Sequence, residues 1–291
     1  MKKLFLLIAG LGFLAAIVGC LLGLTAKQVL ATDRFAALRI KGSGQIVTRT
    51  QNIPAFKAID ASRGIKVAVT EAEAGVVRIE ADDNLIDKEI VEVNNGTLQI
   101  GIDPSVKNLA DHHVAVTVPY HTQIGALEAS SAASIRCDRP LKAAQTSLSA
   151  SSAAKIETHV ESTSCKIDAS SAAKIIAAVT AEECEIETSS AAKVEATVAV
   201  RKCSFDASSA SKIEAQGTAA QCEADIDSAA KLSADEFEVQ DYDIEVSSGA
   251  AADIRCTGTL RAEASSGGSI RYSGDCSTRI EKSSGGSIRA K

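Results

Sequence analysis

The feature that most constrains this chain is a five-residue phrase that returns at a nearly constant interval. It reads SSAAK or a close variant in five successive copies, each 19 residues after the last, which begin at Ser151, Ser170, Ser189, Ser208 and Asp227. Four more divergent copies begin at Ser130, Ser247, Ser265 and Ser283, so that nine copies follow one another at intervals of 18 to 21 residues. A fixed period of this length indicates a repeat architecture, in which each unit buries its apolar face only against its neighbours.

Hydrophobicity within one copy alternates with a period of two. In the third copy, Cys165, Ile167 and Ile175 fall on one parity, whereas Lys166 and Lys174 fall on the other. This alternation is typical of a β-strand, and 19 residues leave no room for two helices and their turns. Aromatic residues make up only 3% of the chain, which suits thin stacked coils. The sequence therefore predicts an all-β fold, a single-stranded parallel β-helix (β-solenoid) of about nine coils.

Equivalent apolar positions should stack into ladders along this solenoid. One ladder comprises Ile135, Ile156, Ile175, Val194, Ile213, Leu232, Ile270 and Ile288. A second comprises Leu127, Leu148, Ile167, Ile186, Phe205, Ile244 and Ile280, with Ala224 and Ala262 as smaller members. The main turn of the third coil should lie between Thr180 and Glu183. The second Ser of each copy, such as Ser171, has the inward parity, so we expect it to be buried at a bend with its hydroxyl hydrogen-bonded.

The N-terminus has the pattern of an export signal. Lys2 and Lys3 precede an apolar run, and residues 1–24 are predicted to be a signal peptide or membrane anchor, in the form of an apolar helix. The segment from Ile17 to Cys20 resembles a lipobox, which makes Cys20 the candidate lipidation site. The apolar run continues past Cys20 and is long enough to span a bilayer uncleaved. Cleavage after Ala31 is the third alternative.

The remaining chain divides into three predicted segments. Residues 25–39 are a mixed linker, residues 40–125 a β-rich N-terminal capping region, and residues 126–291 the solenoid repeats. Asp60-Ala61-Ser62 repeats the phrase Asp168-Ala169-Ser170, which predicts an early, irregular coil within the capping region. The cap should cover the open end of the solenoid, which would otherwise be an exposed sheet edge.

Four cysteines form a further periodic series. Cys165, Cys184, Cys203 and Cys222 stand 19 residues apart on the inward parity, so we expect a core cysteine ladder. Stacked coils would place their Cα atoms roughly 5 Å apart, which lies within the disulfide range. An exported protein could oxidise them in pairs. The favoured interpretation is free thiols that serve as small hydrophobic side chains, because an in-register ladder strains the bridge dihedral.

Charged residues also recur in columns. An acid precedes the first Ser by two residues in most copies, and a lysine follows it by four in five copies, as in Asp168 and Lys174. These columns predict either a binding stripe or, in the simpler interpretation, a solvated face in which the two columns flank the bend and offset each other's repulsion. No zinc motif and no Ser-His-Asp spacing occurs, so we expect no catalytic residue, no metal and no cofactor. The net charge of −6 argues against nucleic acid as a partner.

Several motifs of the capping region point to a known family. They span residues 41–47, 56–59, 64–67, 79–85 and 96–100, and include Lys41-Gly42-Ser43-Gly44 and Gly96-Thr97-Leu98. In their order they resemble the bacterial family named putative auto-transporter adhesin, head GIN domain, over about Ile40 to Lys291. Lys66 departs from the Asn or Asp that is usual in this family. The resemblance implies a β-helical exported protein of unassigned biochemistry.

The sequence thus favours an exported, membrane-tethered β-solenoid that acts as a structural or adhesive cell-surface module without catalytic activity. Its expected location is the cell envelope, facing the periplasm or the cell surface. Expected partners are the membrane through the N-terminus and a surface glycan or protein ligand. Two alternatives stay open: a glycan-binding or glycan-processing β-helix, and an envelope scaffold that self-assembles as a homo-oligomer through the solenoid ends.

Overall fold

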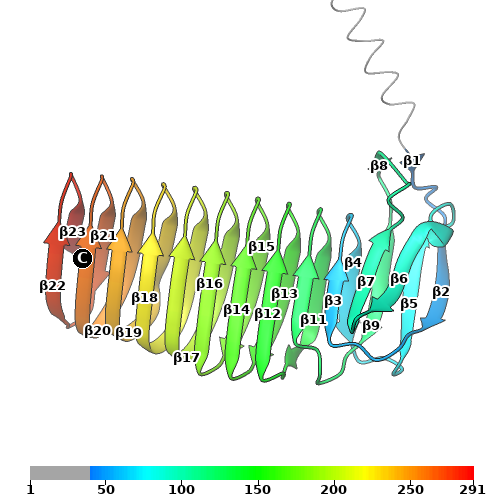
Figure 1. Cartoon of the computed structure of the whole chain (residues 1–291), viewed down its shortest axis with the longest axis horizontal. Helices are drawn as coiled ribbons and strands as arrows, with labels where there is room; N and C mark the ends of the chain where they lie inside the picture. The colour runs from blue at the N-terminus through cyan, green and yellow to red at the C-terminus, as the bar shows by residue number, and fades with distance from the viewer. Residues whose placement is uncertain (1–39) are drawn as a thin grey trace, which may run out of the picture.

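The chain forms a rod of stacked coils with a β-rich cap at its N-terminal end (Figure 1). The computed structural model describes residues 40–291, so the predicted signal or anchor segment, including Cys20, lies outside the described residues. The prediction of an all-β solenoid of about nine coils is confirmed. Each coil contributes one strand segment to each of two walls, called wall A and wall B, which face each other across the core. Within residues 40–291 the only helix is the short η1 (Ile86–Lys88), and no helix there could cross a membrane.

The strands of the two walls follow one another along the rod. Wall A consists of β6 (Glu89–Asn94), β7 (Thr97–Ile102), β3 (Ala58–Ala61), β10 (Ala126–Ala129), β12 (Gln145–Ala150), β14 (Ser164–Ala169), β16 (Glu183–Thr188) and β22 (Ser277–Lys282). Wall B consists of β2 (Ile46–Asn52), β5 (Val76–Asp82), β9 (Val114–Pro119), β4 (Lys66–Thr70), β11 (Ser134–Leu141), β13 (Lys155–Glu161), β15 (Lys174–Thr180), β21 (Ser269–Ser273) and β23 (Ser287–Ala290). Four long strands pass from wall B into wall A: β17 (Lys193–Ala207), β18 (Lys212–Ile226), β19 (Lys231–Val246) and β20 (Ala251–Ala264). Beside the cap, β1 (Ile40–Lys41) pairs with β8 (Leu109–Ala110).

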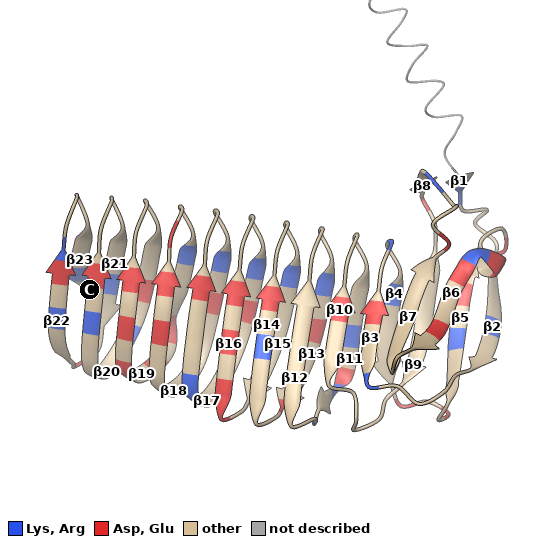
Figure 2. Cartoon of the chain, in the orientation of Figure 1, with Lys and Arg blue, Asp and Glu red and all other residues tan. Residues whose placement is uncertain are grey.

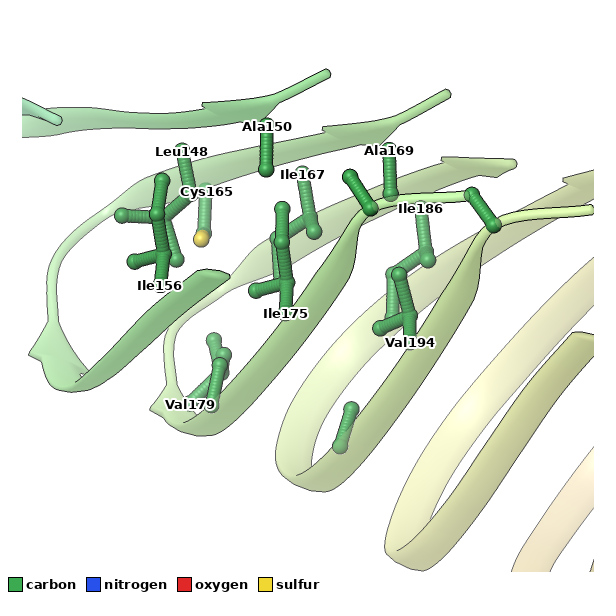
Figure 3. Packing of buried hydrophobic residues seen from close by; sticks show 14 of the residues in the cluster. Leu148, Ala150, Ile156, Cys165, Ile167, Ala169, Ile175, Val179, Ile186 and Val194 are labelled. Carbon is green, nitrogen blue, oxygen red and sulfur yellow. The ribbon is translucent and has the colours of Figure 1, made fainter. Parts of the chain in front are cut away.

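Identical positions of successive coils lie directly over one another. In wall B, Ile175 pairs with Ile156 on one side and Val194 on the other. In wall A, Ile167 is the counterpart of Leu148 and Ile186, and Figure 3 shows the two ladders pointing toward each other across the core. Both predicted apolar ladders are confirmed, and their members are almost entirely buried, apart from Ile280 in the last coil. Burial of these ladders against their neighbours is the main stabilising contribution to the stack.

A tight turn joins wall A to wall B in every repeat. In the third copy the Ala173 amide donates a hydrogen bond to the Ser170 carbonyl at 3.1 Å. The central residues Ser171 and Ala172 have φ values of 52° and 61°, the conformation of a type I′ turn. The Ala172 amide then donates to the Ser190 carbonyl of the next coil at 3.0 Å, so the turns themselves are stacked along one edge of the rod (Figure 1).

This turn corrects one prediction about the repeat. The second Ser of each copy is exposed rather than buried at an inward bend. The equivalent exposed residues are Ser131, Ser152, Ser171, Ser190, Ser209, Ser228, Ser248, Ser266 and Ser284. Two consecutive left-handed residues turn the chain so that both of their side chains point to solvent, and the inward parity resumes at the fourth residue of the phrase, as at Ala173.

The opposite edge carries the looser connection. β15 ends at Thr180 and β16 begins at Glu183, which confirms the main turn predicted between them. Departures from the regular period appear as four register shifts: between Arg136 and Pro140 in β11, between Glu214 and Gln216 at β18, and between Ala234 and Glu238 and between Val239 and Asp241 in β19. At each shift the longer strand of the pair forms a bulge, so the irregular spacings of the sequence become local irregularities of the walls.

The cap terminates the parallel stack with antiparallel strands. β3 and β4 form the early coil predicted from Asp60-Ala61-Ser62, and they pair in register with β10 and β11. On the other side, β3 pairs with β7 and β4 with β9, still in parallel. β6 then adds to β7, and β5 and β2 add beyond β9, all antiparallel. These antiparallel strands cover the end of the stack. Each one occupies the backbone hydrogen-bonding groups of its neighbour without continuing the parallel repeat.

Candidate functional site

A groove lies on the outer surface of wall B, over the regular coils. It has a volume of about 570 Å³ and crosses β13, β15, β17, β18 and β19. Its lining consists of Glu157, Thr158, His159, Ile176, Ala177, Ala178, Glu195, Ala196, Thr197, Glu214, Ala215, Gln216, Ser233, Asp235 and Glu236. The groove therefore runs along the rod across five coils, perpendicular to the strands, and suits an extended ligand rather than a compact one.

Small inward side chains explain why wall B is hollow at this point. Between the buried Ile175 and Val179, the inward position of the third coil holds only Ala177. Its counterparts in the next two coils are Ala196 and Ala215, which pair in register with it. A methyl group fills less of the core than an isoleucine, so close packing draws the backbone of wall B toward wall A. A small residue on the inside thus becomes a depression on the outside.

The groove is bounded where the 19-residue period breaks. The bulge of β11 between Arg136 and Pro140 accounts for the 21-residue interval that separates the first two repeats. At the other end, Asp235 and Glu236 belong to the irregular part of β19 and line the groove directly. The repeat intervals were therefore a usable signal for the ends of the groove, although the sequence interpretation did not identify the groove itself.

One side of the groove is a continuous ladder of ion pairs. Lys174 and Lys193 both contact Glu195 at 2.7 Å, and Lys193 reaches Glu214 at 2.9 Å. Lys212 completes the row by pairing with Glu214. Hydrogen bonds from Lys174 and Lys193 lower the pKa of Glu195, and those from Lys212 and Lys193 lower the pKa of Glu214. Both carboxylates stay ionised at neutral pH, and the row presents donors and acceptors with little net charge.

Neutral polar groups occupy the other side. Gln216 donates from Nε2 to Thr197 Oγ1 at 2.7 Å, and the exposed His159 occupies the equivalent column two coils before Thr197. Ala178, between His159 and Thr197, leaves this side open. The groove can therefore offer amide, hydroxyl and imidazole groups to a ligand together with the paired carboxylates and ammonium groups.

The predicted acid and lysine columns are both present, but their pairing differs from the expectation. The lysines pair with glutamates of their own wall, such as Lys174 with Glu195, and not with the acids across the tight turn. On wall A, Asp206, Asp225 and Glu245 make no ion pair with any residue of the described range 40–291. Burial, then the charges of Asp225 and nearby acids, raises the pKa of Asp206. Figure 2 shows the two columns on opposite sides of the turn edge, acids on wall A and lysines on wall B.

The four predicted ladder cysteines lie in one column inside wall A. Cys184 pairs in register with Cys165 on one side and with Cys203 on the other, and Cys203 pairs with Cys222. All four are buried and are free thiols, and Figure 3 shows Cys165 pointing into the core. We call these four residues the thiol column. Thr146 precedes it in register, and Tyr242 follows it.

Contacts between neighbouring thiols govern the protonation of this column. Hydrogen bonds from the thiols of Cys165 and Cys203 lower the pKa of Cys184. The same contact with Cys184, together with burial, raises the pKa of Cys165 and of Cys203. The pKa of Cys184 falls because a thiolate at this position accepts hydrogen bonds from both sides.

The remaining cysteines of residues 40–291 and the cap histidine His121 do not form a shared site. Cys137 and Cys256 are buried core thiols, and Cys276 is only half-buried. His121 packs edge-on against Phe56 in the cap, with ring centroids 4.7 Å apart, and burial lowers its pKa. Among residues 40–291, no group of three or more His, Cys, Asp and Glu side chains could hold a metal ion together.

These features define a capped parallel β-solenoid, a class of elongated proteins that present repeated side chains along a continuous surface. A family model described as "Putative auto-transporter adhesin, head GIN domain" matches residues 55–197 and 176–276. The chain belongs to this family, which confirms the resemblance noted from the sequence. No curated protein matches the chain.

Three solved structures of the same fold come from species of Parabacteroides. A putative adhesin from Parabacteroides merdae has 19% identity and a TM-score of 0.64, with 87% of this chain and 99% of that chain covered. A putative adhesin from Parabacteroides distasonis has 17% identity and a TM-score of 0.67, with 87% and 100% covered. A third structure, titled a putative lipid binding protein from Parabacteroides distasonis, has 17% identity and a TM-score of 0.61, with 87% and 99% covered. At these identities the likeness establishes the fold alone.

Proposed function

We propose that this protein is an exported, membrane-tethered adhesive module without catalytic activity, and that the wall B groove is its ligand-contact surface. The observation that carries the proposal is a groove across five in-register coils, in which paired charges and neutral polar groups are fixed by the strands. Residues fixed on strands lose little conformational entropy when a ligand binds. Membership of a family described as adhesins agrees with this role.

The groove chemistry favours a neutral, extended glycan as the ligand. Over the first four coils its glutamates, Glu157, Glu195 and Glu214, are each paired with lysine, so a ligand of strong charge would find no complementary surface there. Hydroxyl groups of a glycan can accept from the lysine ammonium groups and donate to Glu195 and Glu214. An acyl chain placed here would remove the water from these charged groups without replacing it, which is costly.

The same electrostatics argue for binding rather than hydrolysis. Glycoside hydrolysis needs a carboxylic acid whose pKa is raised, so that it can donate a proton. The pKa of Glu195 and that of Glu214 are lowered by their lysine partners. Both groups are thus poor proton donors near neutral pH, and a binding function fits them better.

A matched pair of substitutions tests the groove. Thr197→Arg places a long side chain inside the groove, whereas Ser204→Arg places the same side chain on the outer face of wall A. On a glycan array, we expect the wild type and Ser204→Arg to bind the same glycans and Thr197→Arg to lose them. Equal binding by the two variants would locate the contact surface elsewhere. Turnover of a bound glycan that Glu195→Gln abolishes would instead establish the glycan-processing alternative.

Membrane tethering rests on residues 1–24 and on Cys20, as inferred from the sequence. Metabolic labelling with palmitate tests this part of the proposal in cells that express the full chain. Incorporation that is lost in Cys20→Ala supports a lipoprotein anchor. Membrane association without label in either chain supports the uncleaved apolar anchor, and a soluble mature product contradicts tethering.

Self-association is a second candidate function, favoured by the last coil. All six residues of β22 are exposed, and among them Ile280 of the wall A ladder is 37% exposed. A parallel coil that leaves apolar side chains and backbone groups uncovered can accept another strand. Sedimentation at rising concentration should show assembly that Ile280→Asp reduces. A single species at all concentrations would exclude this function.

A further inference from the structure

The adhesive function leaves the thiol column without a role. We propose that Cys165, Cys184, Cys203 and Cys222 form a binding site for soft monovalent metal ions, silver(I) or copper(I), each held between the sulfur atoms of two adjacent coils. This activity is independent of any ligand in the wall B groove. Soft thiolate ligands select soft ions of this kind, and two-coordinate binding needs only two sulfurs for each ion.

The spacing of the coils suits a linear sulfur–metal–sulfur bridge. Register pairing places each cysteine directly over the next, and parallel strands lie ~4.8 Å apart. Two metal–sulfur bonds of the zinc–thiolate length, ~2.3 Å, span about 4.6 Å when they lie in line. An ion can therefore enter between neighbouring thiols with little displacement of the strands. The column offers three such positions: 165–184, 184–203 and 203–222.

A disulfide fits the same positions less well. In a ladder of equivalent residues the Cβ atoms are separated by the same ~4.8 Å as the strands. A disulfide requires Cβ atoms only ~3.5–4.5 Å apart, so the strands would have to approach each other locally. The close packing of the coils above and below resists this movement. The geometry favours a bridging ion over a direct sulfur–sulfur bond.

A second observation points to a ligand in this column. The Thr146 hydroxyl precedes Cys165 in register, and the Tyr242 hydroxyl follows Cys222. Thr146 is 3% exposed and Tyr242 is 2% exposed, yet neither hydroxyl has a hydrogen-bond partner of normal geometry among the described residues. The Tyr242 hydroxyl instead lies against the Cys222 thiol. Buried hydroxyl groups without partners are costly, and here two of them close the ends of a line of sulfur ligands.

The binding step balances in atoms and charge. One monovalent ion between two thiols displaces one proton, and the product is a neutral thiolate–metal–thiol unit. Three ions in the three positions release three protons, and the fourth sulfur keeps its hydrogen, so the net charge of the core is unchanged. Charge neutrality is essential in an aliphatic interior, where an unpaired ion would be strongly destabilised.

The test uses the reduced full chain in detergent, with silver(I) nitrate as the probe in chloride-free buffer. Glutathione is present to remove ions that only one protein sulfur holds. Native mass spectrometry counts the bound ions. In a parallel titration without glutathione, near-ultraviolet absorption reports sulfur-to-silver charge transfer and a pH indicator counts the released protons. The number retained by a variant with all four column residues changed to Ala is subtracted. Circular dichroism checks that every variant, with and without silver, keeps its β-structure.

The proposal predicts a count that depends on position in the column. The wild type should bind three ions and release three protons, Cys165→Ala should bind two, and Cys184→Ala should bind one. Cys137→Ala removes a buried thiol outside the column and should keep three. If Cys184→Ala does not fold, Cys222→Ala should bind two, and Cys165→Ala combined with Cys222→Ala should bind one. Equal losses for end and central cysteines, no bound ions, or binding only with loss of β-structure would each overturn the proposal.

Discussion

At the scale of single residues, the unusual feature is the pair of left-handed residues in each tight turn. Ser190 and Ala191 have φ values of 51° and 61°, and a left-handed conformation costs a residue with a Cβ atom ~1–2 kcal/mol. Small side chains keep this cost at the lower end, and three C-terminal copies place Gly249, Gly267 and Gly285 at the second position. The residue types of the repeat phrase therefore depend on the geometry of the turn as much as on packing in the core.

Glycine at this position should stabilise the fold. Ala191→Gly removes the Cβ atom from a left-handed residue, and we expect a gain of about 0.5–1 kcal/mol in the free energy of unfolding. Ala192→Gly is the matched control, because Ala192 is buried and has no positive φ; it should destabilise the fold. Urea unfolding followed by circular dichroism measures both, and a loss of stability in Ala191→Gly would contradict the assigned turn.

The apolar ladders make a second prediction at this scale. Ile175→Ala should cost ~2–5 kcal/mol, because the layers above and below are held in register and cannot fill the cavity. Ile176→Ala removes the same atoms from the outer face of wall B, where Ile176 is only half-buried, and should cost far less. Urea denaturation compares the two variants, and similar losses would contradict the inward assignment of Ile175.

The same residues show how much the sequence could predict. Alternation correctly placed Ile167 and Ile175 in the core, because each lies within a strand where parity is strict. It failed at Ser171, because a turn of two left-handed residues does not follow strand parity. The wall B groove could not be inferred from alternation either. The groove depends on how closely the backbone of wall B approaches wall A where the buried side chains are small, as at Ala177 and Ala196. This distance is a property of the two packed walls together.

At the scale of elements, the cap joins the outermost strands of the two walls at the N-terminal end of the rod. Gln51 of β2 donates from Nε2 to the Val91 carbonyl of β6 at 2.7 Å, which joins the outermost strands of walls B and A. Glu89 of β6 lies near Arg49 of β2, and both of its carboxyl oxygens are buried without a hydrogen-bond partner among the described residues. Burial raises the pKa of Glu89 to about 7, and the charge of Arg49 offsets only part of this effect.

This carboxyl group makes the cap sensitive to pH. The pKa of Glu89 rises from its ordinary 4.5 to about 7 in the folded chain, so its contribution to stability is full below pH 4.5 and is lost as the pH rises through 7. Glu89→Gln should remove this dependence and make the protein more stable than the wild type at pH 8. Glu92→Gln changes an exposed glutamate of the same strand and should keep the wild-type dependence. Thermal unfolding between pH 5 and pH 8 measures all three, and an unchanged slope in Glu89→Gln would contradict the assignment.

At the scale of the whole molecule, the solenoid is nearly one-dimensional. Each coil contacts only its neighbours, so local stability depends on how many sides of a coil are covered. β16 lies between β14 and β17 in wall A, whereas β22, among the strands of residues 40–291, pairs only with β20 and is exposed along its length. Opening should therefore begin at the last coil and proceed toward the cap.

Hydrogen exchange can detect this gradient. We expect the amides of β22 and β23 to exchange fastest among the solenoid strands and those of β16 to exchange slowest, since exchange follows the free energy of local opening. Mass spectrometry of peptides across residues 126–291 resolves the order. Uniform exchange along the rod would show that the solenoid opens as a single cooperative unit.

The type I′ turns and the constant 19-residue spacing give this molecule a modular length. Removing residues 170–188 would delete one complete coil, yet every remaining coil would meet a neighbour of the same design, with valine over isoleucine in wall B, phenylalanine over isoleucine in wall A, and cysteine over cysteine. A duplication or deletion of one such unit in the gene would therefore alter how far the rod reaches without requiring a new interface. Evolution could adjust the reach of such a rod in steps of about 4.8 Å, the thickness of one coil.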